Sequence, residues 1–213
     1  MKAFFGYKLK AGFLSIFILI SFQTFGQTLD YKIVNSIYQN RNQNLDPFFH
    51  GLSISTAWVC LAYPIGLESA ALFRSDSALF VKGISAGIGL GASTLATYLA
   101  KETIKRKRPF KTHSNIIPPY EIPITSSFPS GHTSSAFETA THFSLTFRKW
   151  YYVVPAYTWA SSVAWSRLHQ GVHYPSDVLV GALVGSTFAW MSYKTNRWLG
   201  HKTVKVRRKF LKK

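Results

Sequence analysis

The sequence predicts an all-α protein, a membrane-embedded helical bundle of about five spanning helices plus an N-terminal surface helix. Apolar residues make up 47% of its 213 positions, and most of them gather in five long segments. The longer segments approach the roughly 17–25 residues that a helix needs to cross a bilayer. Most of the 25 Lys and Arg lie in short runs between or beyond these segments, where spanning helices would end.

Residues 1–26 predict a signal peptide. Several Lys precede the apolar stretch Ala11–Phe22, and small residues follow it, so we place the cleavage after Gly26. An uncleaved anchor helix is the alternative, because the apolar stretch is of borderline length. Under both interpretations the chain continues on the outer side of the membrane.

Residues 27–50 predict an amphipathic helix that lies at the membrane surface. Leu29, Ile33 and Ile37 recur at helical spacing among polar residues. Asp46-Pro47 indicates the turn that leads out of this helix.

Residues 51–199 predict the bundle itself. Its apolar segments are Leu52–Phe73, Leu79–Ala100, Thr133–Phe147, Tyr151–Trp165 and Asp177–Tyr193. The third and fourth are short, and the third contains Glu138 and His142, so they cross a bilayer only if extended or shielded by their neighbours. The mean hydropathy of +0.05 is also low for five spans.

Glycines recur every four residues in two of the segments, at Gly83, Gly87, Gly91 and at Gly181, Gly185. A nucleotide-binding loop would need a preceding strand and a following Gly-Lys-Ser/Thr, and neither is present in the sequence. Close packing of helices in a bilayer is therefore the expected role of these glycines.

The distribution of charge predicts which ends of the segments lie outside. If the chain starts outside and alternates, the basic tail 200–213 is cytoplasmic, as the positive-inside rule expects. The basic run Lys101–Lys111 then lies outside, on the disfavoured side, which suggests an anionic ligand there. The same alternation brings the three polar motifs described below to the outer face.

The formal net charge of +17 raises the possibility of nucleic-acid binding. The cations, however, are confined to short runs separated by apolar stretches, so no nucleic-acid partner is expected. Cys60 is the only cysteine, which excludes an internal disulfide and a cysteine-based metal cluster.

The first polar motif contains Lys101 and Arg108. On one helix these two cations would lie two turns apart on the same side, with Lys105 between them. Pro109 would stop that helix and orient Arg108. An ordinary basic patch that contacts lipid headgroups is the alternative.

The second motif, Pro129-Ser130-Gly131-His132, opens the third apolar segment. Free backbone N–H groups at a helix N-terminus bind anions, and Gly131 lets the backbone approach a ligand closely. His132 would then lie on the first turn beside the anion. A plain Ser-Gly helix cap is the alternative.

The third motif contains Arg167, His173 and Asp177. Arginine presents a planar fork that matches phosphate oxygens. Asp177 lies four residues after His173, and Pro175 suits a first helical position, so the carboxylate could accept a hydrogen bond from one ring nitrogen and leave the other free to attack. A structural loop with a capping aspartate is the alternative.

His169 and His173 are also four residues apart, a spacing found in some zinc sites. The glutamate of a His-Glu-x-x-His site is missing, so we expect no metal. No Gly-x-Ser-x-Gly motif supports a serine hydrolase.

Together the three motifs resemble the type 2 phosphatidic acid phosphatase family. Its pattern is Lys-x6-Arg-Pro, then Pro-Ser-Gly-His, then Ser-Arg-x5-His-x3-Asp. The chain matches each position of this pattern between Lys101 and Asp177.

The resemblance implies that this is a phosphatase that needs no metal or other cofactor. His173 would attack phosphorus to form a phosphohistidine, Asp177 would hold its imidazole, and His132 would protonate the leaving oxygen. The phosphoryl oxygens would be held by Lys101, Arg108, Ser130, Gly131 and Arg167. This agrees with the physical argument, because phosphoryl transfer depends mainly on positioning and charge stabilisation.

The expected activity is hydrolysis of a phosphomonoester or diphosphate on a lipid, in the bacterial inner membrane with the site facing the periplasm. Candidate substrates are undecaprenyl diphosphate, phosphatidylglycerophosphate, phosphatidate and a lipid A phosphate. Two alternatives stay open: a soluble periplasmic acid phosphatase of the same superfamily, and a non-catalytic membrane protein whose basic face binds anionic lipid.

Overall fold

The computed structural model describes residues 28–118, 120 and 122–210, with side chains described as far as 198. The expected signal peptide, 1–26, and the last residues of the basic tail, 211–213, lie outside the described residues. All the regular secondary structure in the described part is helical, so the predicted fold class is confirmed.

Five long helices form the bundle: α2 (Asp46–Arg74), α3 (Ser77–Ile104), α5 (Gly131–Phe147), α6 (Trp150–His169) and α7 (Pro175–Phe210). Three short elements accompany them: a helix over residues 28–39, the 3-10 turn η1 (Gln43–Leu45) and α4 (Pro109–Thr112). Each of the five apolar segments predicted from the sequence lies within one long helix.

The N-terminal helix is shorter than expected from the sequence. Within the described residues it runs from 28 and ends at 39 instead of 50, and the turn that follows it contains η1. Asp46-Pro47 does not end this helix but begins α2, because a proline in the first turn of a helix needs no N–H partner.

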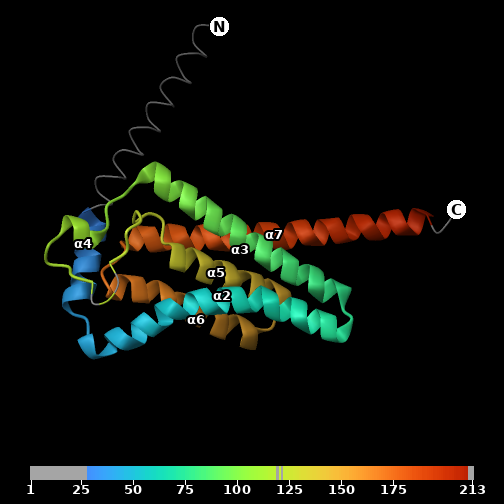
Figure 1. The fold of residues 1–213 in the computed structure, drawn as a ribbon, viewed down its shortest axis with the longest axis horizontal. Coiled ribbons are helices and arrows are strands. Elements are labelled where there is room, and N and C mark those ends of the chain that lie inside the picture. Colours follow the sequence, from blue (N-terminus) through green and yellow to red (C-terminus); the bar gives the residue numbers. More distant parts are fainter. Residues whose placement is uncertain (1–27, 119, 121, 211–213) are drawn as a thin grey trace, which may run out of the picture.

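The α2–α3 connection is a tight hairpin at the end of the bundle far from the polar motifs (Figure 1). Ser75 takes the left-handed conformation, with φ 51°, and ends α2. Asp76 then caps α3, because its carboxylate accepts hydrogen bonds from the N–H groups of Ala78 and Leu79, each at 3.0 Å.

Helix α5 lies at the centre of the bundle and contacts α2, α3, α6 and α7. Its most extensive contact is with α7, where Gly181 and Gly185 have the packing role that was expected of the glycines. Gly91 on α3 has no such contact, because a Cβ there would meet nothing within 4 Å. A Cβ at Gly181 would come within 2.6 Å of the Ser130 carbonyl oxygen, and one at Gly185 within 2.0 Å of that of Ser134. Only glycine allows the two backbones to lie this close, and the contact fixes the first turn of α5 beside that of α7.

The outer surface of the bundle is apolar in the way that a bilayer favours. On α2 alone, Trp58, Leu72 and Phe73 are 73%, 71% and 91% exposed. Gln43–Arg74 and Ser77–Thr112 are long and apolar enough to cross a membrane. The prediction of about five spans stays a prediction for the other three helices.

The helix ends that matter for function meet at one end of the bundle (Figure 1). They are the last turns of α3 and α6 and the first turns of α2, α5 and α7. The N-terminal helix and α4 lie over this same end, next to the loop that leads into α5. The alternating path of the chain therefore brings the three sequence motifs together, as the topology argument required.

Candidate active site

The structure brings the sequence-predicted site residues together at this end of the bundle. They come from four helix ends and two connections: Lys101 from the end of α3, Arg108 before α4, Ser130, Gly131 and His132 at the start of α5, Arg167 from the end of α6, His173 before α7 and Asp177 in the first turn of α7. Except for Gly131 and His132, all of them are buried.

Lys101 and Arg108 lie close together, but not on one helix as predicted. Helix α3 ends at Ile104, and Lys105 has φ 48° and an exposed side chain, so the two cations do not share a helix. Pro109 begins α4 instead of stopping α3. The left-handed residue at the end of α3 reverses the chain and returns Arg108 toward Lys101.

One extended loop holds both cations. The Lys101 Nζ donates to the carbonyl oxygen of Ser126 at 2.6 Å. Arg108 donates from Nε to the carbonyl oxygen of Thr125 at 2.8 Å and from Nη2 to the Thr125 hydroxyl at 3.1 Å. Because these bonds orient two long, flexible side chains, the site is organised before an anion binds.

The imidazole of His173 faces Arg108. Its Nε2 lies 3.1 Å from Arg108 Nη1, and only 2% of the residue is exposed. A guanidinium can only donate hydrogen bonds, so Nε2 must be the acceptor and the proton of a neutral ring must be on Nδ1. The lone pair of Nε2 therefore points at a cation suited to hold a phosphate.

Burial lowers the pKa of His173 to about 3. Asp177 opposes this shift, whereas the positive charges of Arg108 and Arg167 add to it. The ring is therefore neutral near pH 7, which is the state that a nucleophile requires.

Asp177 faces the other ring nitrogen, but the contact is long. Its Oδ2 lies 3.5 Å from His173 Nδ1, which has no hydrogen-bond partner among the described residues. The same oxygen accepts the Tyr174 N–H at 2.9 Å and the Ser127 hydroxyl. The carboxylate thus lies beside Nδ1 of His173, as predicted. The distance between Oδ2 and Nδ1 would have to shorten for an ordinary hydrogen bond to form.

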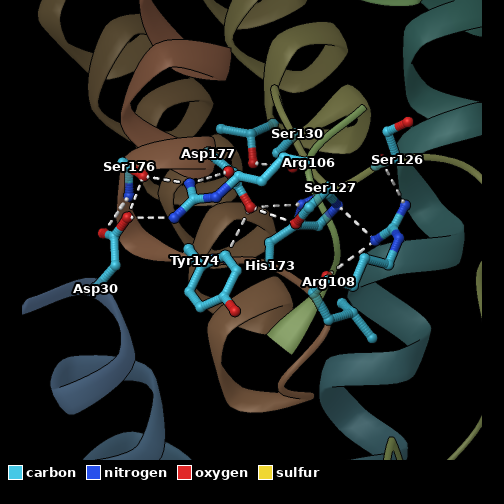
Figure 2. A network of polar contacts seen from close by, with 12 residues as sticks. Asp30, Arg106, Arg108, Ser126, Ser127, Ser130, His173, Tyr174, Ser176 and Asp177 are labelled. Carbon is cyan, nitrogen blue, oxygen red and sulfur yellow. Dashed lines mark hydrogen bonds and ion pairs between the residues drawn. The ribbon is translucent and has the colours of Figure 1, made fainter. Parts of the chain in front are cut away.

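The other carboxylate oxygen binds a residue that sequence reasoning missed. Arg106 Nη1 donates to Asp177 Oδ1 at 2.6 Å, and Arg106 Nη2 donates to Asp30 at 2.8 Å (Figure 2). The sequence placed Arg106 in a basic run without distinguishing it from its neighbours. Asp30 lay in the predicted surface helix, 76 residues before Arg106, so no local signal could have paired them.

Helix α5 begins at the predicted motif, but one of the backbone N–H groups expected to bind an anion is already hydrogen-bonded. The Ser130 N–H donates to the Asp177 carbonyl oxygen at 3.0 Å, and its hydroxyl accepts from Thr133 at 2.9 Å. The N–H of Ser130 is thus already hydrogen-bonded within the protein and is not available to an anion. Gly131 and His132, in contrast, are accessible to solvent. Lys101, Arg108 and Arg167 all lie close enough to His132 for their charges to act on its imidazole.

Arg167 and His169 contact α2. Arg167 donates from Nη1 to the Ser53 hydroxyl, which holds the guanidinium at the edge of the site. His169 Nε2 lies 2.7 Å from the Asp46 carboxylate. His169 and His173 therefore have separate partners, and the zinc interpretation of their spacing has no support from this geometry.

Comparison with known proteins places this site in a family. The family model of the PAP2 superfamily matches residues 82–200, more than half of the chain and all three motifs. The fold is similar to that of a transmembrane PAP2-type phosphatidylglycerolphosphate phosphatase from Bacillus subtilis, with a TM-score of 0.70 at 23% identity over 86% of this chain and 94% of that one. The chain belongs to the PAP2 superfamily and is a membrane protein.

Among curated proteins, the chain is 35% identical over 66 residues to the lipid A 4'-phosphatase of Bacteroides thetaiotaomicron. That alignment covers 31% of this chain and only 29% of the relative. The chain is also 28% identical over 167 residues to the lipid A 4'-phosphatase of Porphyromonas gingivalis, covering 73% of this chain and 70% of that protein.

Proposed function

We propose that this protein is a metal-independent lipid phosphatase that works through a phosphohistidine on His173. The observation that carries this proposal is the His173 ring, neutral and buried, with its Nε2 lone pair 3.1 Å from Arg108. Three cations from separate parts of the chain surround the His173 ring: Lys101, Arg108 and Arg167. Such a cluster of preorganised donors stabilises the charge of a transferring phosphoryl group.

The reaction has two steps. His173 Nε2 attacks phosphorus and the bond from phosphorus to the leaving oxygen breaks, while His132 gives that oxygen a proton. A water molecule then attacks the phosphohistidine, His132 accepts the proton of the water, and inorganic phosphate leaves as His173 is restored. The negative charge of the bound phosphate offsets the nearby cations, which favours the protonated His132 that the first step needs.

The lipid substrate is supported by the apolar surface next to the site. A groove of about 840 Å³ runs between α2 and α6 and is lined by apolar and aromatic side chains, among them Phe49, Val154 and Trp165. Phe49 also contacts the His169 ring, with ring centroids 4.3 Å apart, so the groove reaches the site end of the bundle. We propose that an acyl chain of the substrate lies in this groove while its phosphate is bound by the cations.

A lipid A phosphate is the substrate that we propose first, because the two relatives compared above are lipid A 4'-phosphatases. A polyprenyl diphosphate is the second candidate, because it presents the same phosphate chemistry on an apolar chain. The positive-inside distribution supports a multi-pass arrangement in the inner membrane, with the site on the periplasmic face.

The test uses the full-length protein purified in detergent and a panel of lipid A, undecaprenyl diphosphate, phosphatidylglycerophosphate and phosphatidate. We expect phosphate release from at least one lipid and, after rapid quenching with radiolabelled substrate, a protein-bound phosphate that is stable to alkali and labile to acid. His173→Ala should abolish both signals, whereas Lys107→Ala, a change at an exposed position, should retain them. Phosphate release that persists in His173→Ala would overturn the proposal, and binding of lipid without turnover would favour the non-catalytic alternative.

A further inference from the structure

A second network lies behind the proposed nucleophile and connects it to the N-terminal helix. Arg106 is at its centre (Figure 2). The guanidinium donates from Nη1 to Asp177 Oδ1 at 2.6 Å and to the Ser176 hydroxyl at 2.7 Å, and from Nη2 to Asp30 Oδ2 at 2.8 Å. One planar side chain thus joins a carboxylate of α7 to a carboxylate of the helix over residues 28–39.

Asp30 is held at both oxygens. Its Oδ1 accepts the Ser176 N–H at 3.0 Å, and its Oδ2 accepts the Ser176 hydroxyl as well as Arg106. Asp30 is 7% exposed and Asp177 is fully buried. Arg106 supplies the positive charge that compensates the burial of both carboxylates.

The geometry of Asp177 shows what Arg106 contributes. Oδ2, the oxygen on the His173 side, also accepts the Tyr174 N–H and the Ser127 hydroxyl. Oδ1 faces away and accepts from Arg106. Bonds at both oxygens fix the plane of the carboxylate and hence the direction in which Oδ2 faces the imidazole.

The N-terminal helix is anchored over this network at further points. The Tyr38 hydroxyl accepts the Ile117 N–H at 3.0 Å, and the Tyr31 ring stacks on His113 with centroids 3.7 Å apart. The Arg106 guanidinium also lies 4.1 Å from the centre of the Tyr174 ring, next to the nucleophile. The helix is therefore attached to the segment that follows α4 and, through Asp30, to Arg106 and the start of α7.

We propose that Arg106 is a positioning residue for Asp177, and that Asp30 holds Arg106 in place, so that the N-terminal helix forms part of the catalytic framework. This inference rests on the proposed function, because it assigns these residues to the orientation of His173. Arg106 touches neither the proposed phosphate position nor His173 in the described contacts; it acts through the carboxylate.

The first experiment compares Arg106→Gln and Arg106→Lys with Lys107→Ala, a matched change at the next position, whose side chain is exposed. We expect Arg106→Gln to lower kcat by about 10- to 100-fold, the scale of a small misplacement of a reacting group, with KM within about threefold of wild type. Arg106→Lys should recover part of kcat because it restores the charge. Guanidinium ions added to Arg106→Ala should also restore activity, a rescue that a loss of folding would not show.

The second experiment is a double-mutant cycle with Asp30→Asn. Alone, this substitution should lower kcat at unchanged KM, by less than Arg106→Gln does. In the Arg106→Gln background it should have little further effect, because Asp30 acts through Arg106. Unchanged kcat in either single variant, or fully additive effects in the double variant, would overturn the inference.

The two proposals fail in different ways. A wild-type protein without activity on every lipid of the panel would contradict the proposed function. A wild-type protein that is active while Arg106→Gln keeps its kcat would contradict only the positioning role. If Arg106→Gln does not fold, Asp30→Asn still decides the question, because it leaves the charge of Arg106 in place.

Discussion

Two histidine–aspartate pairs lie at the same end of this bundle, and they differ in their distance and in the groups that surround the imidazole. His169 and Asp46 are 2.7 Å apart, whereas His173 and Asp177 are 3.5 Å apart. The first pair joins α6 to the start of α2. Asp46 accepts one further hydrogen bond, from Arg41 Nε at 3.3 Å. Asp177 accepts from Arg106, Ser127 and Tyr174, and Nε2 of its histidine accepts from Arg108.

The shorter contact is thus the structural one, and the longer contact belongs to the proposed nucleophile. Nε2 of His169 contacts the Asp46 carboxylate, whose negative charge would repel a phosphate. His173 instead keeps Nε2 on the side of the cations. The shorter histidine–aspartate distance alone would have identified His169 as the nucleophile. The groups around Nε2 distinguish the two histidines.

The largest expected difference between the pairs concerns their carboxylates. Asp177→Asn should lower kcat by roughly a hundredfold or more with little change in KM, because the amide no longer stabilises the charge that develops on His173. Asp46→Asn should leave kcat within about threefold and lower the melting temperature, because it weakens a buried contact between α2 and α6. Steady-state kinetics and thermal melts in detergent measure both. A raised KM alone in Asp177→Asn would contradict its assigned role.

A smaller difference should appear in the pH dependence of stability. The pKa of His173 is lowered to about 3 in the folded protein, against an ordinary value near 6.5. Between these values the unfolded state binds more protons, so the contribution of neutral His173 to stability is complete above about pH 6.5 and is lost as pH falls below it, by at most about 1.4 kcal/mol per pH unit.

Tryptophan fluorescence melts between pH 7 and pH 5 test this contribution. The melting temperature of wild type should fall relative to that of His173→Asn as the pH decreases, with Lys107→Ala following wild type. A constant difference between wild type and His173→Asn across this range would mean that His173 is not buried in its neutral form.

The smallest effect is expected from removal of metal. If His169 and Asp46 were two ligands of a catalytic metal, a chelator would abolish phosphate release. We interpret them as a structural hydrogen-bonded contact, so activity should stay within about twofold in excess chelator. Vanadate, which mimics the five-coordinate phosphoryl group, should inhibit. Loss of activity in chelator, restored by zinc, would contradict the metal-free reaction.

The candidate site shows how far sequence reasoning reached. The spacing of His173, Pro175 and Asp177 correctly predicted a helix that begins at Pro175 with the carboxylate in its first turn. The motif Pro129-Ser130-Gly131-His132 was also correctly predicted to open a helix, which begins at Gly131. Both are local features, in which a few neighbouring residues decide the backbone conformation.

The same reasoning was wrong for Lys101 and Arg108, which it placed on one helix. Their seven-residue spacing suits a helix, but Lys105 takes a left-handed conformation and Arg108 is held by the carbonyl oxygens of a loop some seventeen residues later. Nothing in the local sequence specifies that loop as the partner of Arg108.

The sequence by itself determined the helices, their apolar faces and the order in which they alternate, because these depend on the composition and period of short segments. It also determined which polar motifs would share an end of the bundle. Only the tertiary structure decided that Asp30, Arg106 and Asp177 form one network, because buried charges find their partners through packing between segments that lie far apart along the chain.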